Sequence, residues 1–347
     1  MKKTIKKILE EILAQQEKWN YYSYENTINP FDSNENSKEF IKNFIIKSCK
    51  AETNQLYQKI NNLVDGRALH IVSTFFLGIY FYENSASIKR QLNKTLKKYK
   101  NPKKYKSTIE FSFVWFLACL FHDLGYEFEA ESKYESFEIF FEEEKLISLK
   151  KYSGVPSIYS QIYKDYFNYR VLKNKNDHGI CAAFVLFSDL QKIRKEQEES
   201  ANNSTGLCWE KSLVNVYNFA AWTILAHNIW YADSKEQLTV NNYKEANLND
   251  LILKENEFKI TLVKHPFLFL FCLIDSIEPL KRVKRFSLLE KIEIQILNDT
   301  IIIESKLECG CHDTILNQAY DLRKWLSTAR KTDNTVQVDL LPQSYCE

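Results

Sequence analysis

Glycine and proline are scarce in this chain, which has seven Gly and six Pro among 347 residues. Turn-rich β architectures need more of both, because these two residues supply the special backbone angles of tight turns. Long uninterrupted helices suit this composition better. The apolar share of 45% is enough for a sizeable core. The composition therefore predicts an all-α fold class.

Long hydrophobic runs and a strong net charge are also missing. The longest apolar runs, near 111–121 and 266–274, are shorter than the roughly 18–20 residues that span a bilayer. The start, MKKTIKKILEEILAQQEKW, is charged throughout and shows no signal-peptide pattern. A net charge of +2 gives no strong field for binding nucleic acid. We expect a cytoplasmic protein with reduced thiols and no membrane partner.

The pattern of apolar and polar residues divides the chain into three parts. Residues 1–64 are predicted to be an N-terminal helical segment packed on the core. Residues 65–285 carry the most apolar predicted helices, which cover 68–82, 108–124, 178–197, 211–230 and 266–281. Three less apolar stretches interrupt them and are predicted to be insertions: 84–107, 127–176 and 231–262. Residues 286–347 are predicted to form a small β-hairpin over 291–305, a helix near 313–331 and a polar tail.

Four of the six histidines lie in or at the ends of the apolar helices: His70, His122, His178 and His227. They occur in RALHIVSTFFLGIYF, FLACLFHDLGYEFE, NDHGICAAFVLF and WTILAHNIW. Asp123 follows His122 directly, and HPFLFLFCLIDSIEP carries Asp275 in a fifth apolar helix. A buried imidazole or carboxylate without a partner costs a few kcal/mol, about 2–7. A single such His is usually satisfied by a carbonyl, but a metal site satisfies this whole set together. Imidazoles and carboxylates suit divalent Mn, Fe, Co, Ni or Zn.

The order of these residues resembles that of the HD-domain superfamily of metal-dependent phosphohydrolases. In this chain the order is His70, then His122-Asp123, then His178, His227 and Asp275, and the resemblance covers roughly residues 65–282. HDLGY is similar to the HD-x-G continuation of the family, and DHG followed by small and apolar residues is a common form of its third element. The predicted insertions explain why the sequence spacings between these residues are longer than in compact members of the family. Tyr126 stands where many members carry Lys.

The resemblance implies a helical bundle whose site residues come from different helices. It implies a first metal ion held by four residues: His70, His122, Asp123 and Asp275. Asp123 would bridge to a second metal ion held by His178 and His227. The implied cofactors are divalent transition-metal ions, two in number.

Several further residues are candidates for binding a phosphate group, donating a proton or orienting the histidines at such a site. Arg67 lies one helical turn before His70 and shares its face, which suits binding of a phosphate group. Lys281 and Arg282, shortly after Asp275, are the next cationic candidates. Tyr126 is a candidate to donate to a phosphate or a leaving oxygen. Asp177 and Glu278 are candidates to accept hydrogen bonds from the second nitrogens of the histidines. Each of these residues also has an ordinary reading as a surface charge or a helix terminator.

The sequence favours a hydrolase that uses metal-activated water on a phosphoester of a nucleotide, a cyclic nucleotide or an oligonucleotide. The aromatic stretch YSGVPSIYSQIYKDYFNY, from Tyr152 to Tyr169, is interpreted either as core packing or as a lid that stacks on nucleobases. Two alternatives stay open: an HD-type di-iron oxygenase, and a non-catalytic helical scaffold that binds a nucleotide. A homo-oligomer that pairs through the edge of the hairpin is a further possibility.

Overall fold

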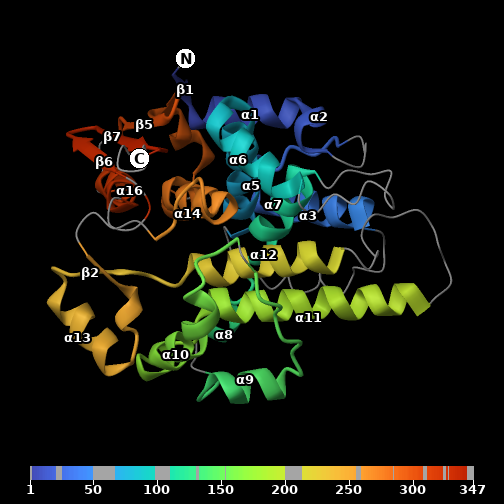
Figure 1. Ribbon diagram of the computed structural model, residues 1–347. Coiled ribbons are helices and arrows are strands. Elements are labelled where there is room, and N and C mark those ends of the chain that lie inside the picture. The colour runs from blue at the N-terminus through green and yellow to red at the C-terminus, as the bar shows by residue number, and fades with distance from the viewer. Residues whose placement is uncertain are drawn as a thin grey trace.

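The computed structural model describes most of the chain, in stretches separated by gaps. The described residues are 2–20, 26–49, 67–97, 110–129, 133–152, 154–199, 213–254, 259–283, 285–307, 311–322, 326 and 328–341. Over these residues the protein is mostly helical, with a small antiparallel sheet at one side (Figure 1). The prediction of a mainly helical chain is confirmed.

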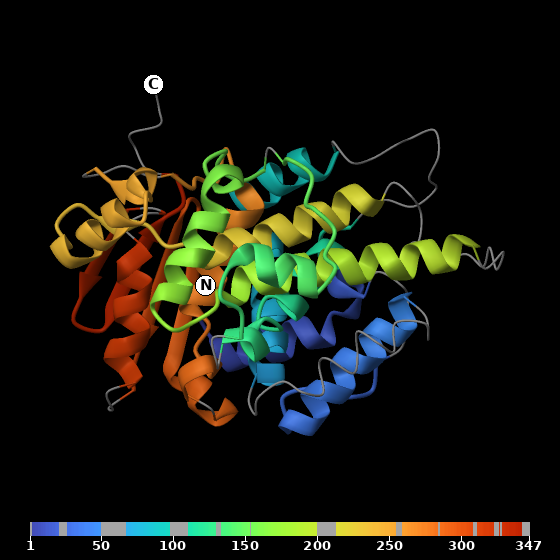
Figure 2. The same ribbon diagram turned by 90° about the horizontal axis from the view of Figure 1, so that it is seen from below.

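Four apolar helices form the centre of the protein: α5 (Arg67–Asn84), α7 (Phe111–Phe121), α12 (Leu213–His227) and α14 (Pro266–Ile277). Helix α5 contacts α7 and α14, and α12 contacts the same two helices. Every residue of α7 is buried, as expected for a helix that is apolar on all sides. Helix α11 (His178–Glu199) packs along α12, and the C-terminal end of α11 extends beyond α12 (Figure 2).

The N-terminal segment lies on this centre. It comprises β1 (Lys3–Thr4), α1 (Ile5–Ala14), α2 (Gln16–Trp19) and α3 (Asn34–Cys49). Each of these three helices contacts α5. Trp19 is fully buried and stacks against Phe44 with ring centroids 5.9 Å apart. The aromatic side chains of this segment therefore extend the core rather than form a separate one.

The predicted insertions contain more core material than expected. In 84–107, helix α6 (Ala86–Lys97) buries Ile88, Leu92 and Leu96, which share one face at helical spacing. Residues 98–109 lie outside the described part. In 127–176 the structure has three helices: α8 (Tyr126–Glu129), α9 (Phe137–Glu143) and α10 (Tyr159–Leu172). Tyr159 and Tyr166 of the aromatic stretch are buried, so these two rings are core packing.

The third predicted insertion, 231–262, is a small mixed unit. It contains β2 (Ala232–Asp233), α13 (Gln237–Glu245), the 3-10 helix η3 (Asn249–Leu251) and β3 (Ile252–Leu253). Strands β2 and β3 pair in parallel. After α14 come α15 (Leu280–Val283) and the 3-10 helix η4 (Phe286–Lys291), which lead to the sheet.

The predicted hairpin is present but belongs to a larger sheet. Strands β4 (Ile292–Leu297) and β5 (Thr300–Ser305) pair around Asn298, whose φ of 47° fits a tight turn. The sheet has the order β1-β4-β5-β7-β6, so the N-terminal strand pairs with β4. Two of its strands, β6 (Ala329–Thr332) and β7 (Thr335–Asp339), come from residues expected to be helix and tail.

The expectation of a polar C-terminal tail was therefore wrong. Helix α16 (Cys311–Asp321) ends earlier than predicted, and β7 alternates buried Val336 and Val338 with more exposed neighbours. The buried face of the sheet packs on α16, which contacts β5, β6 and β7. A strand buried on one face needs only alternate apolar residues, so its mean hydropathy is low.

Two other expectations concern thiols and membranes. Cys119, Cys181 and Cys272 are buried and form no disulfide, as expected of reduced core thiols. Among the described residues, no helix has the length and apolarity to cross a bilayer.

Candidate metal centre

The candidate site residues meet at one end of the helical bundle. Helices α5 and α11 begin there, with His70 in the first turn of one and His178 as the first residue of the other. Helices α7 and α12 end there, at His122 and His227. Asp275 lies in the last turn of α14. The ends of five helices, three C-termini and two N-termini, therefore bring these side chains together.

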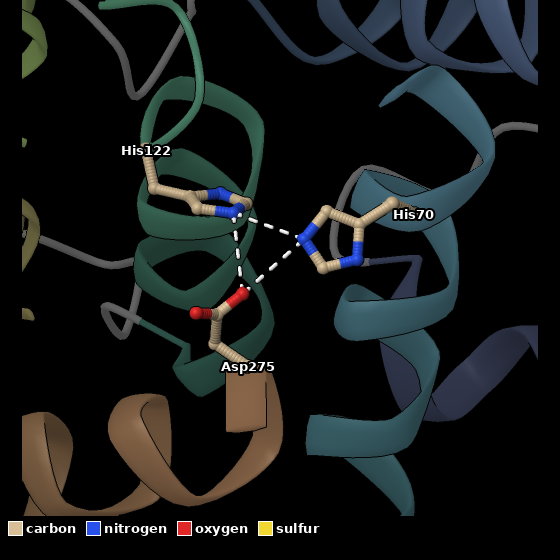
Figure 3. Close-up of side chains that lie close together, drawn as sticks. All are labelled: His70, His122 and Asp275. Carbon is tan, nitrogen blue, oxygen red and sulfur yellow. Dashed lines mark hydrogen bonds and ion pairs between the residues drawn. The ribbon is translucent and has the colours of Figure 1, made fainter. Parts of the chain in front are cut away.

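His70, His122 and Asp275 form a possible metal-binding triad, with ligand atoms that all lie within 4.8 Å of one another (Figure 3). The Nε2 atoms of His70 and His122 are 3.2 Å apart. Asp275 Oδ1 lies 3.2 Å from His70 Nε2 and 3.7 Å from His122 Nε2. Ligands bound at about 2.0–2.2 Å around one tetrahedral ion are about 3.3–3.6 Å apart. The three distances in the triad are close to this range, so these residues could hold such an ion.

Asp123 lines the same space and has an atom without a hydrogen bond. Its side chain is fully buried, and Oδ1 has no hydrogen-bond partner among the described residues. Oδ1 lies 3.3 Å from His122 Nε2, and Oδ2 lies 3.8 Å from His70 Nε2. A buried carboxylate oxygen without a donor is costly unless a cation is near it. The orphaned oxygen is therefore a second observation that fits a metal ion at this point.

The two histidines at helix C-termini are oriented by their own helices. His122 Nδ1 donates to the carbonyl of Cys119 over 2.7 Å, and His227 Nδ1 donates to the carbonyl of Ile224. The last carbonyls of a helix lack intrahelical partners, so each imidazole satisfies one of them. A carbonyl only accepts, which assigns the proton to Nδ1. Nε2 of both rings is left with a free lone pair, as a metal ligand requires.

The two histidines at helix N-termini have no such carbonyl and are oriented by carboxylates instead. His70 Nδ1 is 2.5 Å from Glu278 Oε2, and His178 Nδ1 is 2.7 Å from Glu129 Oε2. Glu278 is fully buried and also accepts from the backbone N–H of Lys281. These contacts again occupy Nδ1 and leave Nε2 for the site. All four imidazoles thus present the same nitrogen, although different groups hold them.

The four rings form a continuous row. Ring centroids are 5.3 Å apart between His70 and His122, and 5.5 Å apart between His122 and His227. His178 continues the row, 5.5 Å from His227. No hydrogen bond to Nε2 of His178 or His227 is present in the described part of the chain. The row therefore has two halves, the triad at one end and the His178–His227 pair at the other.

Two glycines allow the helices to approach closely at the site. A Cβ at Gly125 would lie 1.9 Å from the backbone oxygen of His178, so the turn after His122-Asp123 packs directly on the start of α11. A Cβ at Gly179 would lie 2.8 Å from the Cβ of Asn228 and 3.2 Å from a ring carbon of His227. Backbone close to backbone leaves no room for a side chain. The G of HDLGY and the G of DHG are thus both needed for packing.

The candidate catalytic residues Arg67 and Tyr126 lie together at the rim. Arg67 Nη1 is 3.0 Å from Asp123 Oδ2, and its Cζ lies 4.2 Å from the centroid of the Tyr126 ring. Tyr126 in turn stacks on His178, with centroids 4.1 Å apart and ring planes 14° from parallel. Lys281 Nζ is 3.3 Å from Asp275 Oδ1. The site therefore contains both carboxylates and the cations that neutralise them.

These charges shift the acid–base behaviour of the site in the expected directions. Burial opposes ionisation of Asp275 and Asp123, but nearby positive groups, chiefly Lys281 for Asp275 and His122 for Asp123, outweigh it and hold both pKa values below their usual range. Burial also opposes protonation of His70, but the Glu278 carboxylate outweighs it and raises the pKa of His70 to about 9. Burial and the neighbouring histidines lower the pKa of His227 to about 3. Without a metal the carboxylates are thus kept ionised and His70 is protonated, and an ion bound at His70 Nε2 would take the place of that proton.

Sequence reasoning identified one orienting group and missed others. Glu278 holds His70 as anticipated, but Asp177 instead caps α11 through the N–H of Ile180 and accepts from Asn228 Nδ2. Glu129, which also binds Arg170 at 2.8 Å, was not foreseen, because nothing in EFEAES sets it apart from its acidic neighbours. The side chain of Arg282 lies outside the described residues.

His265, the histidine next to Pro266, is not part of the site. It is the N-cap residue of α14, while Asp275 lies about 15 Å along the helix axis near the other end. From the sequence, His265 is expected to cap the start of this helix, with an additional metal ligand as the alternative; its position at the N-cap agrees with the first.

Comparisons with protein-family models, with curated proteins and with solved structures find no match to this chain. The assignment of a function therefore depends on the residues described above.

Proposed function

We propose that this protein is a metal-dependent phosphohydrolase of the HD type, acting on a phosphoester of a nucleotide, a cyclic nucleotide or an oligonucleotide. The observation that carries the proposal is the uniform orientation of His70, His122, His178 and His227. Each has Nδ1 occupied by an acceptor and Nε2 left for the site. A structural histidine needs only one partner and has no reason to share this arrangement with three others.

The donor set supports two divalent ions, one at each half of the row. His70, His122 and Asp275 would hold the first, and His178 and His227 would supply nitrogens to the second. Asp123 lies between Arg67 and the two imidazoles of the triad, and a carboxylate has the two oxygens that a shared ligand needs. When bound, divalent ions lower the pKa of water to make a nucleophile and polarise a phosphoryl oxygen.

The remaining polar residues at the site suit a phosphate group. Arg67 and Lys281 bring positive charge to the rim, with side chains 24% and 22% exposed, whereas the side chains of the triad histidines are fully buried. Besides neutralising Asp123 and Asp275, these cations would attract an anionic substrate, which an uncharged substrate would not require. Guanidinium binds phosphate oxygens in a bidentate way, and ammonium adds a point charge.

The test combines metal analysis with a substrate panel. Protein purified without added metal and washed free of loose ions is analysed for metal content, then reconstituted with Mn²⁺, Fe²⁺, Co²⁺, Ni²⁺ or Zn²⁺. We expect about two equivalents per chain and hydrolysis of at least one substrate in a panel of bis-p-nitrophenyl phosphate, nucleotides, cyclic nucleotides and short oligonucleotides. His122→Ala should lower the metal content by about one equivalent and abolish hydrolysis, and His265→Gln should leave both unchanged.

Three outcomes would contradict the proposal in different ways. Failure of every metal to bind would leave a helical scaffold as the better account. Metal binding without hydrolysis of any phosphoester would remove the enzymatic part. Iron content together with consumption of O₂ would favour the oxygenase alternative.

A further inference from the structure

Each carboxylate of the site is paired with a cation that reaches solvent. Arg67 Nη1 lies 3.0 Å from Asp123 Oδ2, and Lys281 Nζ lies 3.3 Å from Asp275 Oδ1. The carboxylate side chains are 0% and 16% exposed. Arg67 and Lys281 thus lie between the two carboxylates and the solvent.

The lysine contacts the same oxygen that faces the triad. Asp275 Oδ1 is 3.2 Å from His70 Nε2 and 3.3 Å from Lys281 Nζ. A metal ion at the triad and the ammonium group would draw on the negative charge of one atom. In Asp123 the two oxygens have different surroundings, since Oδ2 contacts Arg67 while Oδ1 has no hydrogen-bond donor. At Asp275 a divalent ion and the ammonium group would therefore share one oxygen, whereas at Asp123 an ion at Oδ1 would neutralise the carboxylate that Arg67 contacts through Oδ2.

Both cationic residues have a second contact that does not involve Asp123 or Asp275. The Arg67 guanidinium lies over the face of Tyr126 at 4.2 Å, and the Tyr126 ring is fixed by stacking on His178. The backbone N–H of Lys281 is bound by Glu278 at 3.1 Å, which fixes the start of its side chain. Cation–π contact keeps a guanidinium near the ring when its carboxylate partner is lost. The Arg67 guanidinium is therefore held beside Tyr126, and the backbone of Lys281 beside Glu278, independently of Asp123 and Asp275.

We propose that Arg67 and Lys281 are resident counter-cations of the site, which metal binding releases to form a subsite for a phosphate group. The inference rests on the proposed function and adds an order of events to it. Without metal, both cations are neutralised by Asp123 and Asp275, and a phosphate would meet those carboxylates. With metal bound, the carboxylates are neutralised by the ion, and the electrostatic hold on the two side chains weakens. The metal-loaded protein binds phosphate, and the metal-free protein does not.

The test uses the metal alone and inorganic phosphate as probes. Calorimetric titration with Mn²⁺ or Co²⁺ measures metal affinity of the dialysed full-length protein and of Arg67→Gln and Lys281→Gln. Removal of a competing cation is expected to tighten metal binding by about two- to five-fold, the range of partly exposed ion pairs. Phosphate binding is then measured with and without metal. We expect each variant to lose at least about ten-fold in phosphate affinity when metal-loaded, since charge-assisted contacts are the strong ones.

Matched variants separate this effect from general loss of charge. Arg330→Gln removes another Arg–Asp pair, with Asp339 at 3.4 Å on the surface, and should change neither affinity. Arg67→Lys keeps the charge without the planar fork and should return metal affinity toward that of the unmodified protein. If Arg67→Gln does not fold, Lys281→Gln decides the question through the other carboxylate.

The results that overturn the inference differ from those that overturn the proposed function. Weaker metal binding in both glutamine variants would mean that the cations position the carboxylates rather than compete for them. Equal phosphate affinity with and without metal would also overturn it. A protein that binds no metal at all would instead refute the proposed function, and neither titration requires turnover of a substrate.

Discussion

His122 and His227 end two different buried helices, lie with ring centroids 5.5 Å apart, and are held in the same way, each by the carbonyl three residues earlier. A helix C-terminus offers unpaired carbonyls and a negative partial charge. An imidazole placed there satisfies a carbonyl with one nitrogen and turns the other toward the site. The end of a helix is thus a simple way to orient a ligand for a cation.

The first prediction concerns the group that orients His70. Glu278→Gln keeps the size of the side chain but removes the charge that faces His70 Nδ1. We expect affinity for the metal at the triad to fall by about 10–100-fold, as is typical when an outer partner of a metal-bound histidine is changed. Metal titration by calorimetry measures it. Glu290→Gln, which removes an exposed partner of Lys6, is the control and should have no effect. An unchanged affinity in Glu278→Gln would show that His70 needs no carboxylate.

The second prediction concerns the two halves of the row. His178→Ala and His227→Ala each remove a nitrogen from the half away from the triad. We expect the metal content to fall from about two equivalents to one, because His70, His122 and Asp275 are untouched. Elemental analysis of the reconstituted, washed protein provides the count, with His265→Gln as the variant that retains two. A content of two equivalents in both alanine variants would refute a metal at this half.

The third prediction tests the close approach at Gly125. In Gly125→Ala the new methyl group would lie 1.9 Å from the backbone oxygen of His178, so α11 or the turn must move. We expect a loss of about 1–3 kcal/mol in the free energy of unfolding, the usual cost of overpacking, measured by urea denaturation. At Gly154 the nearest atoms belong to the Tyr152 side chain, which is able to move aside. Gly154→Ala should therefore cost less, and an equal or smaller cost at Gly125 would contradict the close packing.

The fourth prediction concerns acid stability. Burial, with a smaller effect of Lys264, lowers the pKa of His265 from its usual 6.5 to about 4. Folding therefore favours the neutral ring, so this contribution is fully present above pH 6.5 and is lost as the pH falls toward 4. Between pH 7.5 and 4.5, His265→Gln should lose about 1–2 kcal/mol less than the unmodified protein, allowing for partial exposure. Urea denaturation of both metal-free proteins measures the difference, and parallel pH profiles would exclude the effect.

The sequence determined the helices and the residue types of the site. Apolar runs such as 111–121 are buried on every side and begin and end close to where their composition changes, since a helix that is apolar all round is stable only in a core. The sequence also placed a histidine or aspartate near the end of each such run. The sequence did not reveal β7, because only one face of this strand is buried. Its two buried side chains, Val336 and Val338, are too few to make the segment apolar overall.

Only the tertiary structure decided which groups hold the histidines and which cations face the carboxylates. Glu129 binds His178, and Arg67 binds Asp123, across gaps in the sequence that no local pattern spans. Local periodicity fixes the face on which a side chain lies, because helix geometry repeats every 3.6 residues. Contacts between segments depend instead on how closely the helices pack, which at Gly125 and Gly179 is set by the lack of a side chain.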